Sequence, residues 1–180
     1  MLRLQDRLPV TVIRPPAIYG PRDQEILAFF QAIRRTRTAI RMGTSMQSIA
    51  LVYADDAADA CARAALTDVP SGSTYFIDDG EVYTYEQMAA AVAEAYGIRL
   101  LASGSVPRQL LGIAAFASEA LGKVRGQAVM FNRDKLNELL MEHFTVDSTA
   151  TRRDLGWEPK VTFQEGARRT AKWYREHGWD

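Results

Sequence analysis

The sequence has very little of the side-chain chemistry that builds self-contained metal or nucleophilic sites. Among its 180 residues there are one cysteine and two histidines. Cys61 cannot form a disulfide within the chain or half of a Cys-x-x-Cys site, so the sequence predicts a reducing, cytoplasmic setting. His143 and His177 each stand near a carboxylate in a polar segment, without a paired base or a second ligand, and we interpret both as surface residues. The sequence therefore predicts no metal site.

An excess of charge of either sign is also missing. Lysine plus arginine and aspartate plus glutamate number 22 each, which gives a formal net charge of zero. Such a chain attracts neither nucleic acid nor an anionic membrane surface, and we expect neither as a partner. The most apolar stretch, Leu110 to Leu121, is too short to span a bilayer, and residues 1–6 are too polar for a signal peptide. The sequence predicts a soluble protein without a membrane span.

What the sequence does contain is a succession of short apolar runs and amphipathic segments. Hydrophobic residues make up 47% and charged residues 24% of the chain, which is ordinary for one globular domain or for a large piece of one. We expect strands over residues 8–13, 49–53 and 74–77. We expect helices over residues 26–37, 57–66, 85–96, 107–121, 133–141, 147–155 and 162–178.

Polar residues at the expected helix starts support several of these helices. Thr84 and Gln87 have the spacing of a capping box, as do Thr162 and Glu165. Asp56 is placed to cap the helix over residues 57–66. The residues expected to end the last two helices are Gly156 and Gly178.

Two acidic doublets, Asp55-Asp56 and Asp78-Asp79, resemble paired catalytic carboxylates only at first sight. Neighbours in sequence point to different sides of a strand and meet only in turns. We therefore favour capping and turn formation for both doublets. Cys61 lies on the alanine-rich face of its helix, where we expect it to be buried as a small apolar side chain.

A rigid segment follows the first expected strand. Pro15 and Pro16 come directly after the β-branched run, and Tyr19-Gly20-Pro21 closes the segment, so an ordered and non-helical loop is predicted. Open α/β sheets bind ligands beyond the carboxyl ends of their strands, which makes this loop a candidate site. From the local sequence alone, a plain exit turn explains it equally well.

Several segments together resemble the extended short-chain dehydrogenases of the NAD-dependent epimerase/dehydratase family. Val10–Pro21 is similar to their Arg-Pro-x-x-x-Tyr-Gly-Pro segment, and Leu51–Ala58 to the strand that leads into a helix through paired aspartates. Tyr75–Glu81 looks like their next strand. Asp147–Pro159 and Phe163–Tyr174 are similar to the last two motifs. The motifs occur in the family order and cover nearly the whole chain.

The resemblance implies an α/β fold over residues 1–180: the carboxy-terminal part of a Rossmann-type NAD(P)-binding fold, interleaved with a mostly helical substrate-binding lobe. It implies a small-molecule substrate. Pro15, Pro16 and Ala17 would contact NAD or NADP through their backbone, and Ile18 and Tyr19 would face the substrate.

The sequence also departs from the family, because it contains no glycine-rich dinucleotide loop and no Tyr-x-x-x-Lys pair. Without the glycine turn there is no pyrophosphate site at a helix start, and without the tyrosine there is no general acid/base. We therefore expect the amino-terminal dinucleotide-binding half to be absent, and we expect this chain alone to bind cofactor weakly and to be inactive. No catalytic residue is assigned. The missing half should leave a sheet edge unpaired, which favours a homodimer.

The substrate is suggested by a second departure. Met46 and Gln47 stand where members that act on nucleotide sugars usually place an arginine for the diphosphate. Together with the apolar segment 107–121, this favours an apolar alcohol or ketone of the hydroxysteroid or dihydroflavonol kind. Two alternatives remain open: a nucleotide-sugar epimerase or dehydratase, and a non-catalytic sensor or partner-binding domain that keeps only this part of the fold.

Overall fold

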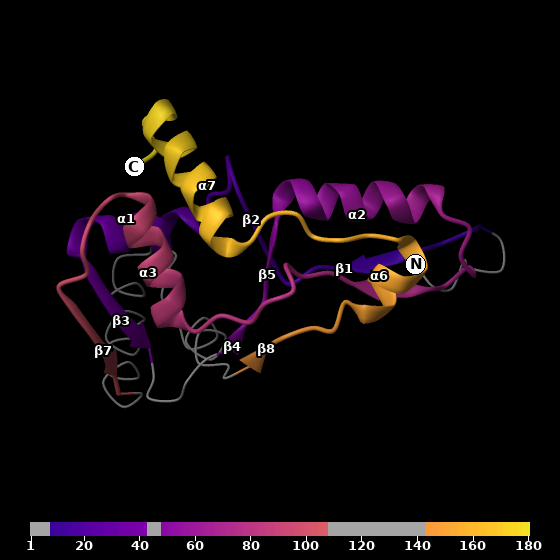
Figure 1. The fold of residues 1–180 in the computed structure, drawn as a ribbon, viewed down its shortest axis with the longest axis horizontal. Coiled ribbons are helices and arrows are strands. Elements are labelled where there is room, and N and C mark those ends of the chain that lie inside the picture. Colours follow the sequence, from indigo (N-terminus) through magenta and orange to yellow (C-terminus); the bar gives the residue numbers. More distant parts are fainter. Residues whose placement is uncertain (1–7, 43–47, 108–142) are drawn as a thin grey trace, which may run out of the picture.

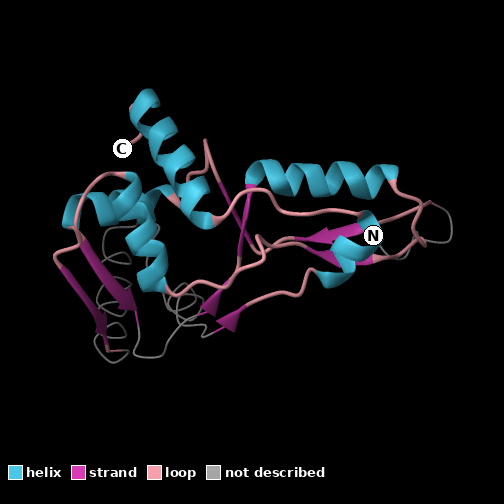
Figure 2. Cartoon of the chain, viewed as in Figure 1, coloured by secondary structure: helices cyan, strands magenta, loops and turns pink. Residues whose placement is uncertain are grey.

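A computed structural model describes residues 8–42, 48–107 and 143–180 of the chain. Its strands are short and pair in parallel (Figures 1 and 2). The strands are β1 (Val12–Arg14), β2 (Ala17–Tyr19), β3 (Thr38–Met42), β4 (Ser48–Ile49), β5 (Leu51–Tyr53), β6 (Thr74–Phe76), β7 (Ala102–Val106) and β8 (His143–Phe144). The described helices are α1 (Leu27–Thr36), α2 (Ala54–Leu66), α3 (Tyr85–Ala95), α6 (Thr149–Leu155) and α7 (Phe163–His177).

The sheet divides at the carboxyl ends of β1 and β6. These two strands pair in parallel up to the register Arg14 with Phe76. Beyond that point β2 pairs with β5, and the carbonyl oxygen of Leu51 accepts a hydrogen bond from the amide of Asp79 at 2.9 Å. β5 therefore lies between β2 and the continuation of β6. We call this place, where β1 and β6 separate and β5 enters, the fork.

The helix ends follow the expected chemistry in most places. At α3 the capping box is present, with Thr84 accepting from the amide of Gln87 and the Gln87 side chain accepting from the amide of Thr84. α6 and α7 end at Gly156 and Gly178, which adopt the left-handed conformation with φ of 57° and 67°. These predictions are confirmed.

Two capping predictions are wrong. α2 begins at Ala54 with Tyr53 at the N-cap, so Asp56 lies inside the first turn. Its carboxylate instead accepts hydrogen bonds from the amides of Lys160 and Val161, at 3.0 and 2.9 Å. Thr162 does hold the N-cap position of α7, but its side chain makes no capping hydrogen bond.

The strand predictions were less accurate than the helix predictions. The strand expected over 8–13 begins only at Val12, and the one expected over 49–53 is interrupted at Ala50, whose amide donates to the carbonyl of Phe144. The segment expected as a loop contains β2. β3 and β7 form a five-residue parallel pair that was not expected at all. The helices expected over 107–121 and 133–141 lie outside the described residues, except for Pro107.

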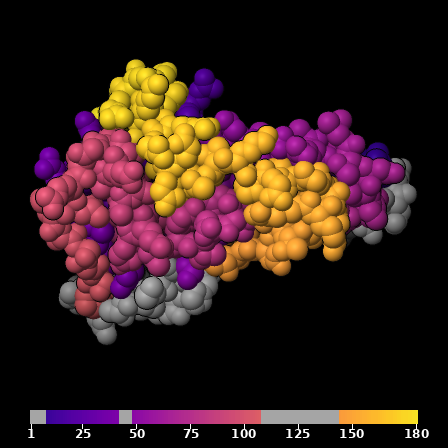
Figure 3. All heavy atoms as spheres, viewed as in Figure 1, coloured from indigo at the N-terminus to yellow at the C-terminus, as the bar shows by residue number. Residues whose placement is uncertain are grey.

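Two groups of buried side chains hold these elements together. The larger contains residues of α1, α3 and α7, with Phe30, Phe163 and Tyr174 among its fully buried members. The smaller surrounds Trp157, whose indole nitrogen donates to the carbonyl of Asp56 at 3.1 Å. In the space-filling view α6 and α7 lie across the face turned to the viewer (Figure 3). No described helix is long and apolar enough to cross a membrane.

The outer edge of β1 borders a concave region. Within the described residues β1 pairs only with β6, so its other edge has no strand beside it. Next to this edge lies a groove of about 650 Å³ between β1 and α2, lined by Pro9, Thr11, Ile13, Cys61, Ala64, Ala65, Thr67, Asp68 and Val69. Cys61 is exposed here, so the prediction that it is buried is wrong. An open strand edge favours association with another strand.

We predict that the chain associates through this edge and that Thr11→Lys weakens the association. Thr11 directly precedes β1, and a lysine at the start of an open edge opposes pairing with another strand, because its charge would have to be desolvated. Light scattering over a series of concentrations should show a lower average mass for Thr11→Lys than for the wild type. Gln24→Lys, which adds the same charge to an exposed position, should behave like the wild type. Equal masses for all three proteins would contradict the prediction.

Candidate functional site

The fork exposes a short stretch of chain at the carboxyl end of β1. Pro15, Ala17 and Ile18 are exposed there, whereas Pro16 is buried. Ile18 is 46% exposed, which is unusual for an isoleucine in a parallel strand. Because the carboxyl ends of parallel strands are where open α/β sheets bind ligands, these residues form one side of a candidate site.

Aromatic side chains at the ends of two other strands are also exposed. Phe76 ends β6 and is 37% exposed, and Phe144 ends β8 and is 46% exposed. The amide of Ala50, directly before β5, donates to the carbonyl of Phe144, so β8 reaches the strand that enters the fork. Sequence reasoning missed both aromatic residues, since neither stands in a segment that was expected to contact a ligand.

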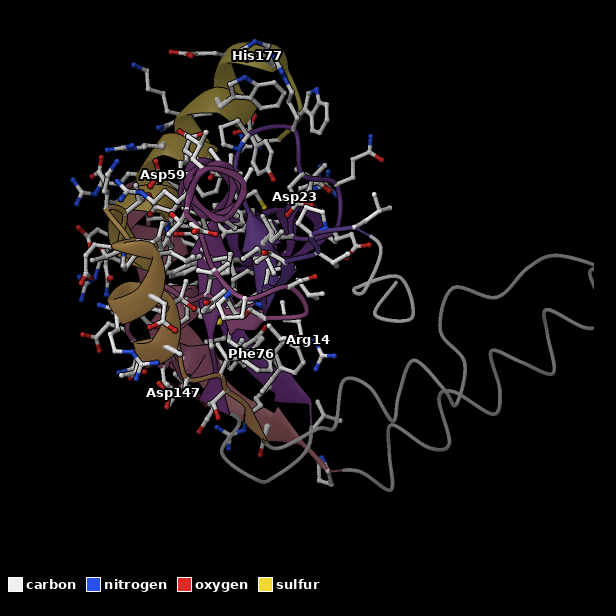
Figure 4. All side chains as sticks on the ribbon, turned by 90° about the vertical axis from the view of Figure 1, so that its right-hand side faces the viewer. Arg14, Asp23, Asp59, Phe76, Asp147 and His177 are labelled. Carbon is white, nitrogen blue, oxygen red and sulfur yellow. The ribbon has the colours of Figure 1, made fainter. Side chains whose placement is uncertain are left out.

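Arg14 adds a positive charge to this side of the sheet. Its guanidinium carbon lies 5.8 Å from the centre of the Phe76 ring, within the range of a cation–π contact. Figure 4 shows Arg14 and Phe76 next to each other, on the side of the ribbon away from α6 and α7. The carboxyl ends of β1 and β6 therefore carry one aromatic ring with one guanidinium beside it.

Tyr19 has a different environment from its neighbour Ile18. Its ring is fully buried, with ring centroids 5.5 Å from Tyr53 and 5.1 Å from Phe163. Its hydroxyl donates to the carbonyl of Thr162 at 3.4 Å, and burial raises the pKa of that hydroxyl well above its usual value. Substrate contact by Ile18 stays a prediction, whereas Tyr19 has no surface open to a ligand in the described chain.

Two further residues were expected to contact the substrate. Met46 and Gln47 lie outside the described residues. Among the residues that are described, no group of three or more histidine, cysteine, aspartate or glutamate side chains is arranged to hold a metal ion.

Asp79 and Tyr83 connect the continuation of β6 to the start of α7. The Tyr83 hydroxyl donates to the Asp79 carboxylate at 2.7 Å and accepts from the amide of Phe163 at 3.2 Å. Burial raises the pKa of the Asp79 carboxyl, although the hydrogen bond from Tyr83 acts in the opposite direction. These groups fix the backbone behind the fork.

Asp78 performs a similar task for α6. Its carboxylate accepts from the hydroxyl of Ser148 at 2.6 Å and from the amide of Gly80 at 3.2 Å. The hydroxyl of Thr151, inside α6, donates to the carbonyl of Phe76. Turn formation by Asp78 and Asp79 is confirmed, because each accepts from the amide two residues on. Within the described chain these carboxylates have partners that explain them without catalysis.

Comparison with known proteins identifies the family. A model of the 3-beta hydroxysteroid dehydrogenase/isomerase family matches residues 1–108, which is more than half of the 180-residue chain. The chain belongs to this family. The resemblance to extended short-chain dehydrogenases, drawn from the sequence motifs, is thereby confirmed.

Individual relatives agree with this assignment. The chain is 28% identical to ceramide reductase of Caulobacter vibrioides and 26% identical to protein YbjS of Escherichia coli K12, in each case over 93% of the chain. It covers 52% and 50% of those proteins, so the chain spans about half the length of the curated relatives it matches.

A solved structure shows the same fold. The dTDP-glucose 4,6-dehydratase of Bacillus anthracis, in complex with NAD, superimposes with a TM-score of 0.66 at 16% identity. The match covers 97% of this chain and 48% of that enzyme. The α/β fold with parallel strands, expected as part of a Rossmann-type protein, is confirmed.

We predict that Asp79 makes the stability of the chain depend on pH. Burial raises the pKa of the Asp79 carboxyl in the folded state. The contribution of Asp79 to the free energy of unfolding is therefore fully present below about pH 4, the ordinary pKa of aspartate, and is lost as the pH rises through the raised folded-state pKa. The asparagine of Asp79→Asn cannot ionise, so this variant should lose less stability than the wild type as the pH rises. The free energy of unfolding is measured by urea unfolding at several pH values. Asp68→Asn, at an exposed position, should keep the wild-type pH dependence; the same profile for both variants would contradict the prediction.

We also predict that Gly166 is required because Tyr19 lies against α7. A Cβ atom at Gly166 would come within 2.7 Å of Cζ and 2.8 Å of Cε2 of Tyr19. Gly166→Ala should lower the free energy of unfolding by about 1–3 kcal/mol, the usual cost of overpacking. The cost should shrink in a Tyr19→Phe background, which lacks the closest atom.

Gly104→Ala is the matched control, since its nearest neighbour, Cδ1 of Ile40, would be 3.9 Å away. Thermal unfolding of the single and double variants gives the coupling between positions 19 and 166. Strictly additive effects would show that the two residues do not limit each other.

Proposed function

We propose that the chain supplies the substrate side of an NAD(P)-dependent oxidoreductase that exchanges hydride at an alcohol or ketone carbon of an apolar molecule. The observation that carries this proposal is the exposed apolar side chain of Ile18, which directly follows the segment proposed to contact the cofactor. Burying a flat hydrocarbon ring against such a side chain is favourable, at about 25 cal/mol per Å² of apolar surface. A hydroxysteroid- or dihydroflavonol-like substrate fits this chemistry, and the family match supports it.

The proposed contacts to the cofactor are made by Pro15, Pro16 and Ala17. Pro15 and Ala17 are exposed at the carboxyl end of β1, so their backbone offers one edge against which a nicotinamide ring fits. When bound, the nicotinamide supplies or accepts the hydride. The described residues hold the ring in position; they include no group assigned to proton transfer. The neighbouring dehydratase structure contains NAD, which supports NAD(P) as the cofactor.

A nucleotide-sugar substrate is the second candidate. The relative of known structure is a dTDP-glucose 4,6-dehydratase, so this fold also serves that substrate class. Against it stands the apolar character of the exposed residues at the fork, since a diphosphate needs charge-assisted hydrogen bonds to offset its desolvation. The remaining alternative is a non-catalytic sensor or partner-binding domain. A protein of that kind would turn over neither apolar substrates nor nucleotide sugars.

The proposal is tested in a chimera in which this chain replaces the matching segment of ceramide reductase. Nicotinamide absorbance is followed with apolar alcohols and ketones, and with nucleotide sugars. We expect turnover of apolar substrates, and we expect Ile18→Asp to lower kcat/KM by about tenfold or more, because a carboxylate would be desolvated against the substrate.

Leu66→Asp is the matched control. Leu66 is 87% exposed at the end of α2, away from the carboxyl end of β1, and its replacement should leave kcat/KM unchanged. Turnover confined to nucleotide sugars would replace the first candidate by the second. A folded chimera that turns over neither class would overturn both and favour a non-catalytic role.

A further inference from the structure

The C-terminal segment 178–180 folds back from α7 onto α1. The carbonyl oxygen of Trp179 accepts a hydrogen bond from Nε2 of Gln31 at 2.7 Å, and the Trp179 ring lies parallel to that of Tyr174 with centroids 6.0 Å apart. Figure 1 shows this end of the chain next to α1. These contacts bring Asp180 to the last turn of α1, where its side chain is only 8% exposed.

The carboxylate of Asp180 is held by a weak contact for so buried a group. Its Oδ2 atom lies 3.8 Å from Nε of Arg34, which is within ion-pair range but too long for a hydrogen bond. Within the described residues no group donates a hydrogen bond to this buried oxygen. Buried carboxylates are stabilised mainly by hydrogen bonds to their oxygens, so Asp180 is an anion that a stronger one can replace.

Two guanidinium groups meet beside this carboxylate, at the ring of Tyr96. The guanidinium carbons of Arg34 and Arg175 each lie 5.7 Å from the centre of that ring. Burial raises the pKa of the Tyr96 hydroxyl to about 12, with Asp180 adding to the rise and both arginines opposing it. All three charged groups therefore act on the same hydroxyl. We call Arg34, Tyr96, Arg175 and Asp180 the Tyr96 cluster.

The Tyr96 cluster contains two positive charges and one negative charge. Guanidinium groups bind oxyanions through N–H donors that lie in their own plane, and they do so most strongly when one anion accepts several of these donors. A phosphate group carries nearly two negative charges at pH 7 and several acceptor oxygens. It can therefore accept from Arg34, Arg175 and the Tyr96 hydroxyl together, and it balances both guanidiniums.

We propose that Arg34, Tyr96 and Arg175 form a binding site for an oxyanion of the phosphate type, and that the carboxylate of Asp180 occupies this site as an intramolecular competitor. Binding of the anion displaces Asp180 and releases segment 178–180 from α1. The inference is independent of the proposed function, because it uses none of the residues assigned to substrate or cofactor.

The test is a titration of the 180-residue chain with sodium phosphate at constant ionic strength. The indole signal of Trp179 and the backbone amide signal of residue 180 are followed by nuclear magnetic resonance. We expect Asp180→Asn to bind phosphate about tenfold more tightly than the wild type, because the competing charge is gone. Adding Arg175→Gln to Asp180→Asn should remove this gain, since one of the two guanidiniums is then missing.

Glu176→Gln is the matched control. It removes the same charge from an exposed position of α7, where Glu176 lies 3.8 Å from Nζ of Lys172. Its phosphate affinity should stay within about twofold of the wild type, because salt screens exposed charges. An equal gain in Asp180→Asn and Glu176→Gln would reveal a general effect of charge and overturn the inference. A folded Asp180→Asn whose two signals do not respond to phosphate would overturn it as well.

Glycerol 3-phosphate distinguishes a free anion from the end group of a larger molecule. If it binds Asp180→Asn at least as tightly as inorganic phosphate does, the site accepts a phosphate carried by an organic ligand. If only inorganic phosphate binds, the free anion is the ligand. Both outcomes support the site, provided that Arg175→Gln weakens the binding in each case.

Discussion

The hydrogen bond from the amide of Asp79 to the carbonyl of Leu51, at 2.9 Å, holds β5 between β2 and the continuation of β6. β5 has backbone partners on both sides, β2 and the segment after β6, and there is room for it only because β1 and β6 separate at their carboxyl ends. Pro15, Ala17 and Ile18 follow this separation along the chain and are exposed. The candidate site is thus a consequence of where one strand inserts, rather than of a specialised loop.

The polar residues behind the fork keep this geometry in place. Asp56, Asp78 and Asp79 are buried. Asp56 accepts from the amide of Val161 and Asp78 from the hydroxyl of Ser148. Asp79 accepts from the hydroxyl of Tyr83, which in turn accepts from the amide of Phe163 at the start of α7. Buried carboxylates are tolerated only when their oxygens are satisfied, so these contacts tie α6 and α7 to the strands that form the site. A set of residues that looks suited to catalysis in the sequence therefore stabilises the fold.

Consecutive residues of β2 have different environments: Ile18 is exposed and Tyr19 is buried in the core. Side chains alternate between the two faces of a strand, so Tyr19 and Ile18 point in opposite directions. Tyr19 packs between Tyr53 and Phe163, and Ile18 is left open to ligand. The strand that carries the exposed Ile18 is thus anchored by the aromatic ring of Tyr19, which limits how far β2 can move relative to α7.

The sequence by itself determined the fold class, the family and most helix boundaries, because these depend on local signals. The capping box of α3 and the glycines that end α6 and α7 act within a few residues, and the family motifs are local as well. Tertiary structure alone decided the burial of Tyr19, the use of Asp56 by residues 160 and 161, and the meeting of Arg14 with Phe76. These contacts join segments tens of residues apart, and no local pattern records which of two alternating side chains will find a covering helix.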